Sequence, residues 1–217
     1  MARILITSGP TRQYIDQVRY ISNASSGQMG AALADAAIKS GHDVVIVSGP
    51  VNINYPALAA VHQVESTEEM LCACLALFSE CDGAIGAAAP CDYRPVIRTP
   101  NKIKKTGKPL TLELIETDDV IASLGKIKRT NQWLVGFALE SEDARFRALS
   151  KLQQKCCDIV VLNGPEAIDS KNNSIEIFDP LGNMILDCQG TKTVVAQAII
   201  ELINQRFIEN GRNQPIS

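Results

Sequence analysis

The sequence predicts an α/β protein of the Rossmann-like class, in which helices cover both faces of a mostly parallel sheet. Short β-branched segments alternate with helical segments along most of the chain, a pattern typical of parallel strands joined by helices. Hydrophobic residues make up 46 % of the 217 residues and charged residues 21 %, the composition of a folded domain. No repeat or low-complexity linker interrupts the sequence, so residues 1–217 are expected to form one domain.

The first half of the chain carries the alternation most clearly. Residues 3–7 and 43–47 are rich in Ile, Leu and Val, which predicts two buried strands. Residues 27–40 space their apolar side chains like a helix and are followed by glycine, a common helix stop. A capping box at residues 66–69 predicts the start of the next helix. Residues 83–88 predict a strand of small residues, where a ligand could approach the main chain closely.

Residues 92–116 break the alternation. They contain three prolines and alternate polar with apolar positions, so we expect an extended arm or flap outside the core. Acidic side chains at 118 and 119 suit the start of a helix, where the helix dipole is positive. The elements expected after the arm are a helix that begins at residues 117–119, a strand at 132–138, a helix from Ser141 to about Cys157, a strand at 158–162, weaker strands at 174–178 and 184–188, and a final helix at 192–207.

The composition argues against several classes of function. Lys and Arg number 21 and Asp and Glu 24, so the formal net charge of −3 does not favour binding to nucleic acid. No apolar run approaches the ~20 residues that cross a bilayer, and the apolar segment near the N-terminus is too short for a signal peptide. The seven cysteines are odd in number and lack zinc-site spacing, which favours reduced thiols. We therefore expect a cytoplasmic protein without a membrane or nucleic-acid partner.

Residues 22–30 lead into the first predicted helix and are rich in serine and glycine. Ser25, Ser26 and Gly27 would leave backbone N–H groups free to bind a phosphate at the helix N-terminus. A plain helix cap on one of the two serines is the alternative. The polar residues expected in the same region are Thr11, Arg12, Arg19 and Asn23. Ligands of parallel sheets bind beyond the carboxyl ends of the strands, and this region follows the first strand.

A cluster of lysines lies in the predicted arm. Residues 101–105 are Asn-Lys-Ile-Lys-Lys, and Lys108 follows. In an extended segment Lys102 and Lys104 share one face, whereas Lys105 lies on the other. A mobile basic arm is suited to closing over a triphosphate. A solvated strand edge that uses lysines to avoid aggregation is the alternative.

Three further charged residues are candidates for ligand binding. Lys151 and Lys155 are four residues apart in one predicted helix, so their ammonium groups are expected to be neighbours. A bound anion would remove the repulsion between them, although a solvated pair costs little. Asp92 follows the small-residue strand and could bind a ribose or, through water, Mg²⁺, with a turn aspartate as the alternative.

Taken in order, these motifs resemble those of one family, phosphopantothenate–cysteine ligase, also called phosphopantothenoylcysteine synthetase, of coenzyme A biosynthesis. Its members often form the second half of a bifunctional decarboxylase/synthetase. The matching segments are residues 7–12, 15–27, 88–95, 102–105 and 135–138, the predicted helix with Lys151 and Lys155, and residues 158–163. They cover nearly the whole chain in the family's order, which makes the resemblance specific.

The resemblance implies a role for three catalytic residues. Asn23 is similar to the asparagine that holds the activated acyl intermediate, and Arg19 to the arginine needed for its conversion to product. Lys102 is similar to the lysine that promotes activation by nucleotide. The implied nucleotide-binding residues are Gly86, Ala87, Ala88, Asp92, Lys102, Asp118, Asp119, Val120, Ile121, Phe137, Lys151 and Lys155, and the implied phosphate- or substrate-binding residues are Asn23, Ser25, Ser26 and Gly27. No metal ligand follows from the resemblance.

The resemblance also implies a two-step ligase reaction. The carboxylate of 4′-phosphopantothenate would attack the α-phosphorus of a nucleoside triphosphate, releasing pyrophosphate and forming an acyl-nucleotidyl intermediate. The amine of L-cysteine would then displace the nucleoside monophosphate and form 4′-phosphopantothenoylcysteine. The lysine motif resembles that of the bacterial type, so CTP is expected rather than ATP, together with Mg²⁺.

The assembly is a further implication of the resemblance. Family members form homodimers, partly through the arm that carries the lysine motif. No segment of this chain resembles the decarboxylase half, so no flavin is expected, and the chain is either a stand-alone synthetase or an excised domain. A separate phosphopantothenoylcysteine decarboxylase would then be a partner. The departures from the family pattern are Gln13, Tyr14, Gln17, Gln28, Thr117, Asp118 and Leu139, and none removes a residue assigned to chemistry.

Two other classes of function remain open from the sequence. An NAD(P)-binding oxidoreductase on the same fold would carry Gly-x-Gly-x-x-Gly after the first strand or a Tyr-x-x-x-Lys pair, and neither is present. A Walker-type Gly-Lys-Ser/Thr is also missing. A non-catalytic nucleotide-binding module would not need Asn23, Arg19 and Lys102 together.

Overall fold

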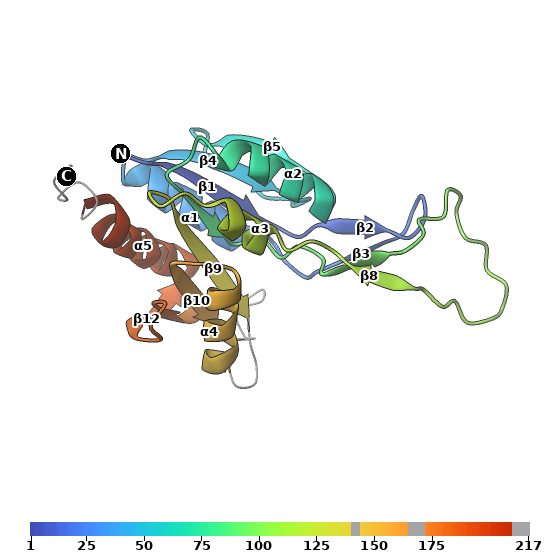
Figure 1. Ribbon diagram of the computed structural model, residues 1–217. Coiled ribbons are helices and arrows are strands. Elements are labelled where there is room, and N and C mark those ends of the chain that lie inside the picture. Colours follow the sequence, from blue (N-terminus) through green and yellow to red (C-terminus); the bar gives the residue numbers. More distant parts are fainter. Residues whose placement is uncertain (140–143, 165–171, 210–217) are drawn as a thin grey trace.

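The computed structural model describes residues 1–139, 144–164 and 172–209, and its centre is an eight-stranded sheet in the order β12-β11-β10-β9-β6-β1-β4-β5 (Figure 1). The strand bounds are β1 Arg3–Ser8, β4 Asp43–Ser48, β5 Ala60–Gln63, β6 Gly83–Gly86, β9 Trp133–Leu139, β10 Ile159–Asn163, β11 Asn172–Phe178 and β12 Met184–Thr191. The strands from β10 to β5 run parallel, β11 is antiparallel to β10, and β12 is antiparallel to β11. This confirms the prediction of a mostly parallel, Rossmann-like sheet.

Helices cover both faces of the sheet. One face carries α1 (Gln28–Lys39) and α5 (Lys192–Ile203), and the other carries α2 (Thr67–Phe78), α3 (Val120–Ile127) and α4 (Ala144–Gln154). Because successive side chains of a strand point to opposite faces, Ile4 and Ile6 of β1 join the core under α1 and α5. Leu5 joins the core on the other face. A π-helical turn at Asn204–Glu209 follows α5.

The caps of α1 and α2 differ in kind. The predicted capping box begins α2, where Ser66 Oγ accepts a hydrogen bond from the Glu69 amide at 3.1 Å and the Glu69 carboxylate accepts one from the Ser66 amide at 3.3 Å. The alternative to phosphate binding, a helix cap of α1 by Ser25 or Ser26, does not form. The N-cap is Gly27, which has a left-handed φ of 74° and no side-chain cap. A Cβ at Gly27 would lie 3.0 Å from a methyl carbon of Val51, so the position favours glycine.

The end of α4 also differs from the prediction. The helix ends at Gln154, and Lys155 lies in the turn that follows, so the expectation of one helix carrying Lys151 and Lys155 is wrong. The next residue, Cys156, has a left-handed φ of 52° that a helix cannot continue. The turn packs closely on α3, because a Cβ at Gly125 would lie 2.0 Å from the Lys155 carbonyl oxygen. The proposed cap Ser141 lies outside the described residues.

Two short antiparallel ribbons extend from the carboxyl edge of the sheet. β2 (Arg12–Tyr14) pairs with β3 (Tyr20–Ser22), and β7 (Tyr93–Pro95) pairs with β8 (Leu114–Glu116). In Figure 1 they project to the right of the sheet, and the chain between β7 and β8 forms a long loop at the far end. The sequence predicts only a loop where β2 and β3 lie, because strands of three residues carry too little alternation to be recognised.

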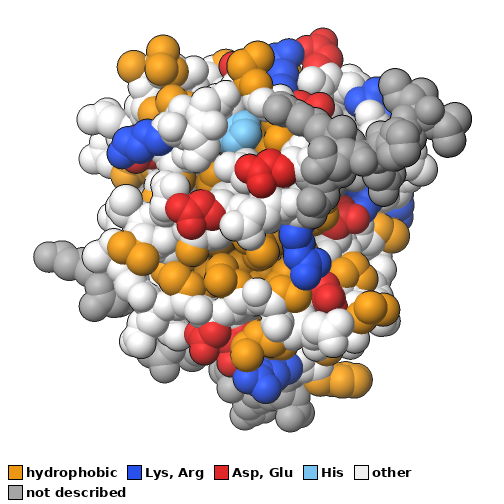
Figure 2. All heavy atoms as spheres, turned by 90° about the vertical axis from the view of Figure 1, so that its left-hand side faces the viewer, with side chains coloured by type: hydrophobic (Ala, Val, Ile, Leu, Met, Phe, Trp, Pro, Cys, Tyr) orange, Lys and Arg blue, Asp and Glu red, His pale blue; other side chains and the backbone are white. Residues whose placement is uncertain are grey.

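The end of the molecule opposite the arm has a different surface. Figure 2 shows hydrophobic side chains gathered across its middle, with Lys, Arg, Asp and Glu side chains of both signs around them. None of the described helices has the length and hydrophobicity that crossing a bilayer requires. The parallel strands end at the opposite side of the molecule, from which the arm projects.

Candidate functional site

A cavity of about 330 Å³ lies beyond the carboxyl ends of β6 and β9, between α3 and the β7–β8 ribbon. Its position agrees with the rule for parallel sheets, and its volume lies within the range of small-molecule sites. The lining residues that the sequence predicts to bind nucleotide are Gly86, Ala88, Asp92, Asp118, Asp119, Val120, Ile121, Phe137 and Lys155. The lining residues that the sequence does not single out are Thr67, Pro90, Cys91, Tyr93, Glu116 and Thr117.

Among the predicted nucleotide-binding residues whose side chains the structure describes, two do not line the cavity. Ala87 packs against the core on the α1 and α5 face, because it alternates with Ala88, whose side chain faces α2 and α3. Lys102 lies on the arm and is exposed. Lys151 belongs to α4, but its side chain lies outside the described part of the chain.

The small residues of β6 make room for protein side chains. A Cβ at Gly86 would lie 2.4 Å from Cδ1 of Ile121, and a Cβ at Gly83 would lie 2.1 Å from the Trp133 ring. These glycines therefore let α3 and β9 pack closely on the strand. Gly86 and Ala88 also line the cavity, so the approach of a ligand to this segment stays a prediction. The close approach of α3 places its first turn beside the cavity.

Buried hydroxyl groups fix the base of the cavity around the main chain of Cys91. The Cys91 amide donates to Thr11 Oγ1 at 2.8 Å, and the Cys91 carbonyl accepts from Thr67 Oγ1 at 3.1 Å and from Thr117 Oγ1 at 2.6 Å. Thr11 and Thr67 are themselves joined at 2.8 Å, and Thr11 must be the donor because the Thr67 proton points to Cys91. The network connects the region before β2, the start of α2 and the chain that enters α3. The three threonines are far apart in the sequence and form no local motif, so the sequence does not predict this network.

The cavity is acidic, with one ion pair. Asp119 is the N-cap of α3, where its carboxylate accepts from the Ala122 amide at 2.9 Å and pairs with Lys155 Nζ at 2.7 Å. Burial alone would raise the pKa of Asp119, but the Ala122 amide and the Lys155 ammonium outweigh it and lower the pKa. The other lining carboxylates are Asp92, Asp118 and Glu116. The wall therefore favours hydrogen-bond donors and cations over phosphates.

Asn23 lies beside the cavity. It follows β3 and is exposed, and its side-chain amide donates to the Pro90 carbonyl at 2.8 Å and to the Ala89 carbonyl at 3.4 Å. Pro90 itself lines the cavity. The structure therefore brings the predicted catalytic amide to the rim of the predicted nucleotide site, although the two are far apart in sequence.

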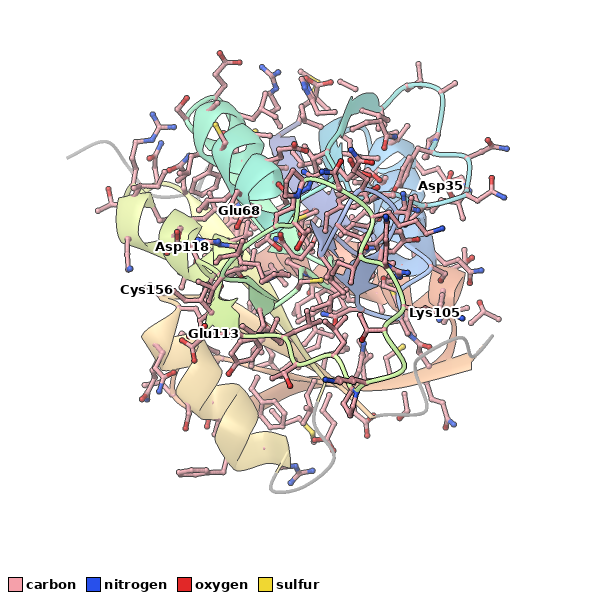
Figure 3. All side chains as sticks on the ribbon, turned by 90° about the vertical axis from the view of Figure 1, so that its right-hand side faces the viewer. Asp35, Glu68, Lys105, Glu113, Asp118 and Cys156 are labelled. Atoms are coloured by element: carbon pink, nitrogen blue, oxygen red, sulfur yellow. The ribbon has the colours of Figure 1, made fainter. Side chains whose placement is uncertain are left out.

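Arg19 and the lysine motif meet on the arm. Arg19 forms an ion pair with the buried carboxylate of Asp16 and donates to the Ile103 carbonyl at 3.3 Å, which places it next to Lys102. Figure 3 looks down the arm from its far end, with Lys105 on one side of the arm loop and Glu113 on the other. Asp118 lies beyond Glu113, on the side of α3. Lys105 is thus separated from Glu113 and Asp118 across this end of the molecule.

The predicted phosphate-binding segment lies at the carboxyl end of β1. Ser8 Oγ donates to the Gly27 carbonyl at 3.1 Å, which holds the start of α1 against the strand. Ser25 and Ser26 are half-buried there. Free backbone amides at a helix N-terminus suit an anion. The described residues contain no group of three or more His, Cys, Asp or Glu side chains placed to hold a metal ion.

These features define the class of the protein as a Rossmann-like α/β protein with a polar site at the carboxyl edge of its sheet. The comparisons identify the family. Residues 1–207 match the family described as DNA/pantothenate metabolism flavoprotein C-terminal domain, and the chain belongs to that family.

Three relatives illustrate the match. The chain is 44 % identical over 207 residues to a "Cysteine/Cysteine sulfinic acid decarboxylase" of an unknown prokaryotic organism, covering 93 % of this chain and 57 % of the relative. It is 37 % identical to "Coenzyme A biosynthesis bifunctional protein CoaBC" of Vibrio vulnificus strain YJ016, covering 92 % of this chain and 51 % of the relative. The crystal structure of a CoaBC C-terminal domain superposes with a TM-score of 0.81 at 35 % identity, covering 94 % of both chains. The chain thus spans about half the length of the curated relatives that it matches.

Lys155→Met removes the ammonium that contacts Asp119 and keeps a side chain of similar length. We expect the pKa of Asp119 to rise, because the loss of the hydrogen bond and the positive charge disfavours the carboxylate. A carbon-13 NMR titration of the carboxyl group measures the change. Lys126→Met is the control. Lys126 lies in the last turn of α3, the helix that Asp119 caps, and its loss should leave the pKa of Asp119 unchanged. An unchanged Asp119 pKa in Lys155→Met would contradict the pairing.

Proposed function

We propose that this chain is a phosphopantothenate–cysteine ligase, which joins 4′-phosphopantothenate and L-cysteine into 4′-phosphopantothenoylcysteine in coenzyme A biosynthesis. Family membership and the similarity to CoaBC support the proposal. The main observation in its support is the arrangement of the motifs in space. Motifs separated by many residues meet at one cavity, with Asn23 bonded to Pro90 on its rim.

The charge distribution supports one orientation of the nucleotide. The carboxylates that line the cavity can accept hydrogen bonds from ribose hydroxyls or an exocyclic amino group, but they repel a triphosphate. The lysines at 102, 104 and 105 and the N-terminus of α1 offer positive potential outside this wall. In the proposed complex the base and ribose therefore occupy the cavity, and the phosphates extend toward the arm. We propose CTP as the nucleotide, on the resemblance of the lysine motif.

The first step activates a carboxylate. An oxygen of the 4′-phosphopantothenate carboxylate bonds to the α-phosphorus of CTP, and the bond to pyrophosphate breaks. Two anions must meet, so the Lys102 ammonium stabilises the charge that develops on the phosphates. Mg²⁺, when bound with the nucleotide, would neutralise further phosphate charge, and it is commonly held through phosphates and water with few protein ligands.

The second step forms the amide. The cysteine amine attacks the acyl carbon of the acyl-cytidylate, negative charge collects on the carbonyl oxygen, and the bond to CMP then breaks. The side-chain amide of Asn23 can donate to this oxygen by exchanging its hydrogen bond to the Pro90 carbonyl. Arg19 provides positive charge beside the arm, because its guanidinium is only half-buried against Asp16. The amine loses its surplus proton to solvent or a nearby base.

Location and partners extend the proposal. All seven cysteines are free, four of them buried, which suits a reducing compartment, and we place the protein in the cytoplasm. A phosphopantothenoylcysteine decarboxylase, separate or fused, would act on the product. The oxidoreductase alternative has no support in the site, since the first strand leads to no glycine fingerprint.

A pyrophosphate-release assay tests the function. The protein is mixed with 4′-phosphopantothenate and Mg²⁺, with CTP or ATP, and with or without cysteine. We expect multiple turnovers only when CTP and cysteine are both present, because cysteine must consume the intermediate before the site is free again. Turnover with ATP alone would keep the ligase and overturn the choice of nucleotide. No release with either nucleotide would indicate a binding module or a decarboxylase, which releases no pyrophosphate.

Asn23→Ala and Lys102→Ala should stop at different steps. Asn23→Ala is expected to release pyrophosphate once and to form product about 10²–10³-fold more slowly, the usual effect of losing one oxyanion donor. Lys102→Ala is expected to fail before pyrophosphate release, because the charge of the first step is unbalanced. Lys108→Ala removes another arm lysine and serves as the control. Rapid-quench measurement of both products separates the steps, and a common block in both variants would contradict this division.

We also propose that the arm joins two copies of the chain. Ile97 is 77 % exposed and Leu110 59 %, and further apolar side chains of the arm are exposed between them and β8. Ile97→Asp should convert a dimer to monomers in sedimentation velocity, because a charge would be buried at the contact. Leu181→Asp, on the β11–β12 turn, is the control. A monomeric wild-type protein would contradict the proposal, as would a dimer in the Ile97 variant.

A further inference from the structure

The turn between β2 and β3 contains a carboxylate that is completely buried. Asp16 is 0 % exposed, although it lies in a short loop outside the two hydrophobic cores. One oxygen, Oδ1, accepts from the amides of Val18 at 2.8 Å and Arg19 at 2.9 Å. This oxygen therefore shapes the turn itself, as aspartate side chains commonly do.

The second oxygen of Asp16 reaches across the chain. Oδ2 accepts from the Ile103 amide at 3.1 Å, a residue 87 positions away, and also contacts the Arg19 guanidinium. Arg19 in turn donates to the Ile103 carbonyl at 3.3 Å, so carboxylate and guanidinium hold both main-chain groups of one arm residue. A third bond, from the Thr99 amide to the Ile15 carbonyl at 2.9 Å, fixes the arm nearby.

The carboxylate remains ionised over the whole working pH range. Burial alone would raise the pKa of Asp16, but three backbone amides and the Arg19 guanidinium outweigh it and lower the pKa to about 2. Charge-assisted hydrogen bonds are stronger than neutral ones, which suits a contact that must hold a long, mostly exposed loop. Lys102 directly precedes Ile103, so the position of its main chain depends on this contact.

We propose that Asp16 is a positioning residue for both steps of the ligase reaction. It holds Arg19 and the Lys102 segment as one unit beside the site, without touching substrate. This inference rests on the proposed function for its kinetic part only. The contact between turn and arm can be measured without any enzymatic activity.

Asp179 provides a matched control. It is also buried, its carboxylate also accepts from amides of its own turn, those of Leu181 and Asn183, and its pKa is also lowered. Its described hydrogen bonds come from within four residues, on the β11–β12 turn. Asp16 and Asp179 therefore share a local structural role, and the contact with the arm distinguishes Asp16.

Limited trypsin digestion tests the contact. Asp16→Asn keeps the shape of the side chain but removes its charge and one acceptor oxygen. We expect cleavage after Lys102, Lys104 and Lys105 to become about tenfold faster than in the wild type, since weaker bonds raise the open population of the arm. Asp179→Asn should leave the rate of arm cleavage unchanged. Equal arm cleavage in the Asp16 variant and the wild type would overturn the proposal.

Kinetics test the consequence for the reaction. In Asp16→Asn we expect kcat for pyrophosphate release and kcat for amide formation both to fall by about 100-fold, the effect of misplacing reacting groups by about 1 Å. The KM for CTP should change little, because the cavity wall is intact. Asp179→Asn should retain both rates even where its melting temperature falls. If both variants had a lower melting temperature but kept both kcat values, the positioning role would be overturned.

A second pair of variants keeps Asp16 itself intact. Ile103→Pro removes the amide donor on the arm and also restricts the main chain at Lys102 and at this position, and Ile103→Ala controls for the lost side chain. We expect Ile103→Pro to show fast cleavage after Lys104 and Lys105, since trypsin does not cut between lysine and proline, together with slow pyrophosphate release. Ile103→Ala is expected to resemble the wild type. Equal behaviour of the two variants would overturn the proposal. If wild-type protein releases no pyrophosphate while arm cleavage follows this pattern, the ligase function and the kinetic role of Asp16 fail, and the contact alone stands.

Discussion

The site depends on how the main chain of Cys91 is held. Thr11 binds its amide, and Thr67 and Thr117 bind its carbonyl, and of these residues Thr67, Cys91 and Thr117 line the cavity. Buried polar groups need partners, so none of the bonds can be lost without leaving another group unsatisfied. The constraint fixes the first ribbon, the start of α2 and the approach to α3 relative to one another. The cavity keeps its shape because these three segments cannot move independently.

Charge is arranged around this rigid base in two regions. The cavity wall carries Asp92, Glu116, Asp118 and Asp119, balanced in part by Lys155, and the arm carries the lysine motif. At an effective dielectric constant of about 20, like charges a few ångströms apart repel by several kcal/mol. A nucleotide that binds in the proposed way is therefore oriented by repulsion from the wall as well as by attraction to the arm. In the proposed complex, this arrangement would let a protein of net charge −3 bind two anionic substrates.

The sequence predicts the sheet well because its signal is local. β1 and β4 are recognisable from their apolar runs, and the cap of α2 from Ser66 and Glu69. The sequence predicts less where a distant contact determines the local structure. Gly27 caps α1 because Val51 leaves no room for a Cβ, and Gly86 is small because Ile121 packs on it. Neither neighbour can be identified from the residues next to the glycine.

Contacts between distant residues limit the prediction of the site even more than that of the fold. Family motifs predict most of the cavity wall, but they give no indication of Glu116, which lies in β8 and is paired with Tyr93 of β7. Asp16 belongs to a motif, yet its role depends on Ile103, 87 positions away. The two oxygens of Asp16 have different dependence on the arm. Without the Ile103 amide, Oδ1 would still have its two amide partners and Oδ2 would still have Arg19, so the charge would stay paired. The turn between β2 and β3 therefore has its own hydrogen bonds, whereas the position of Ile103 depends on that turn.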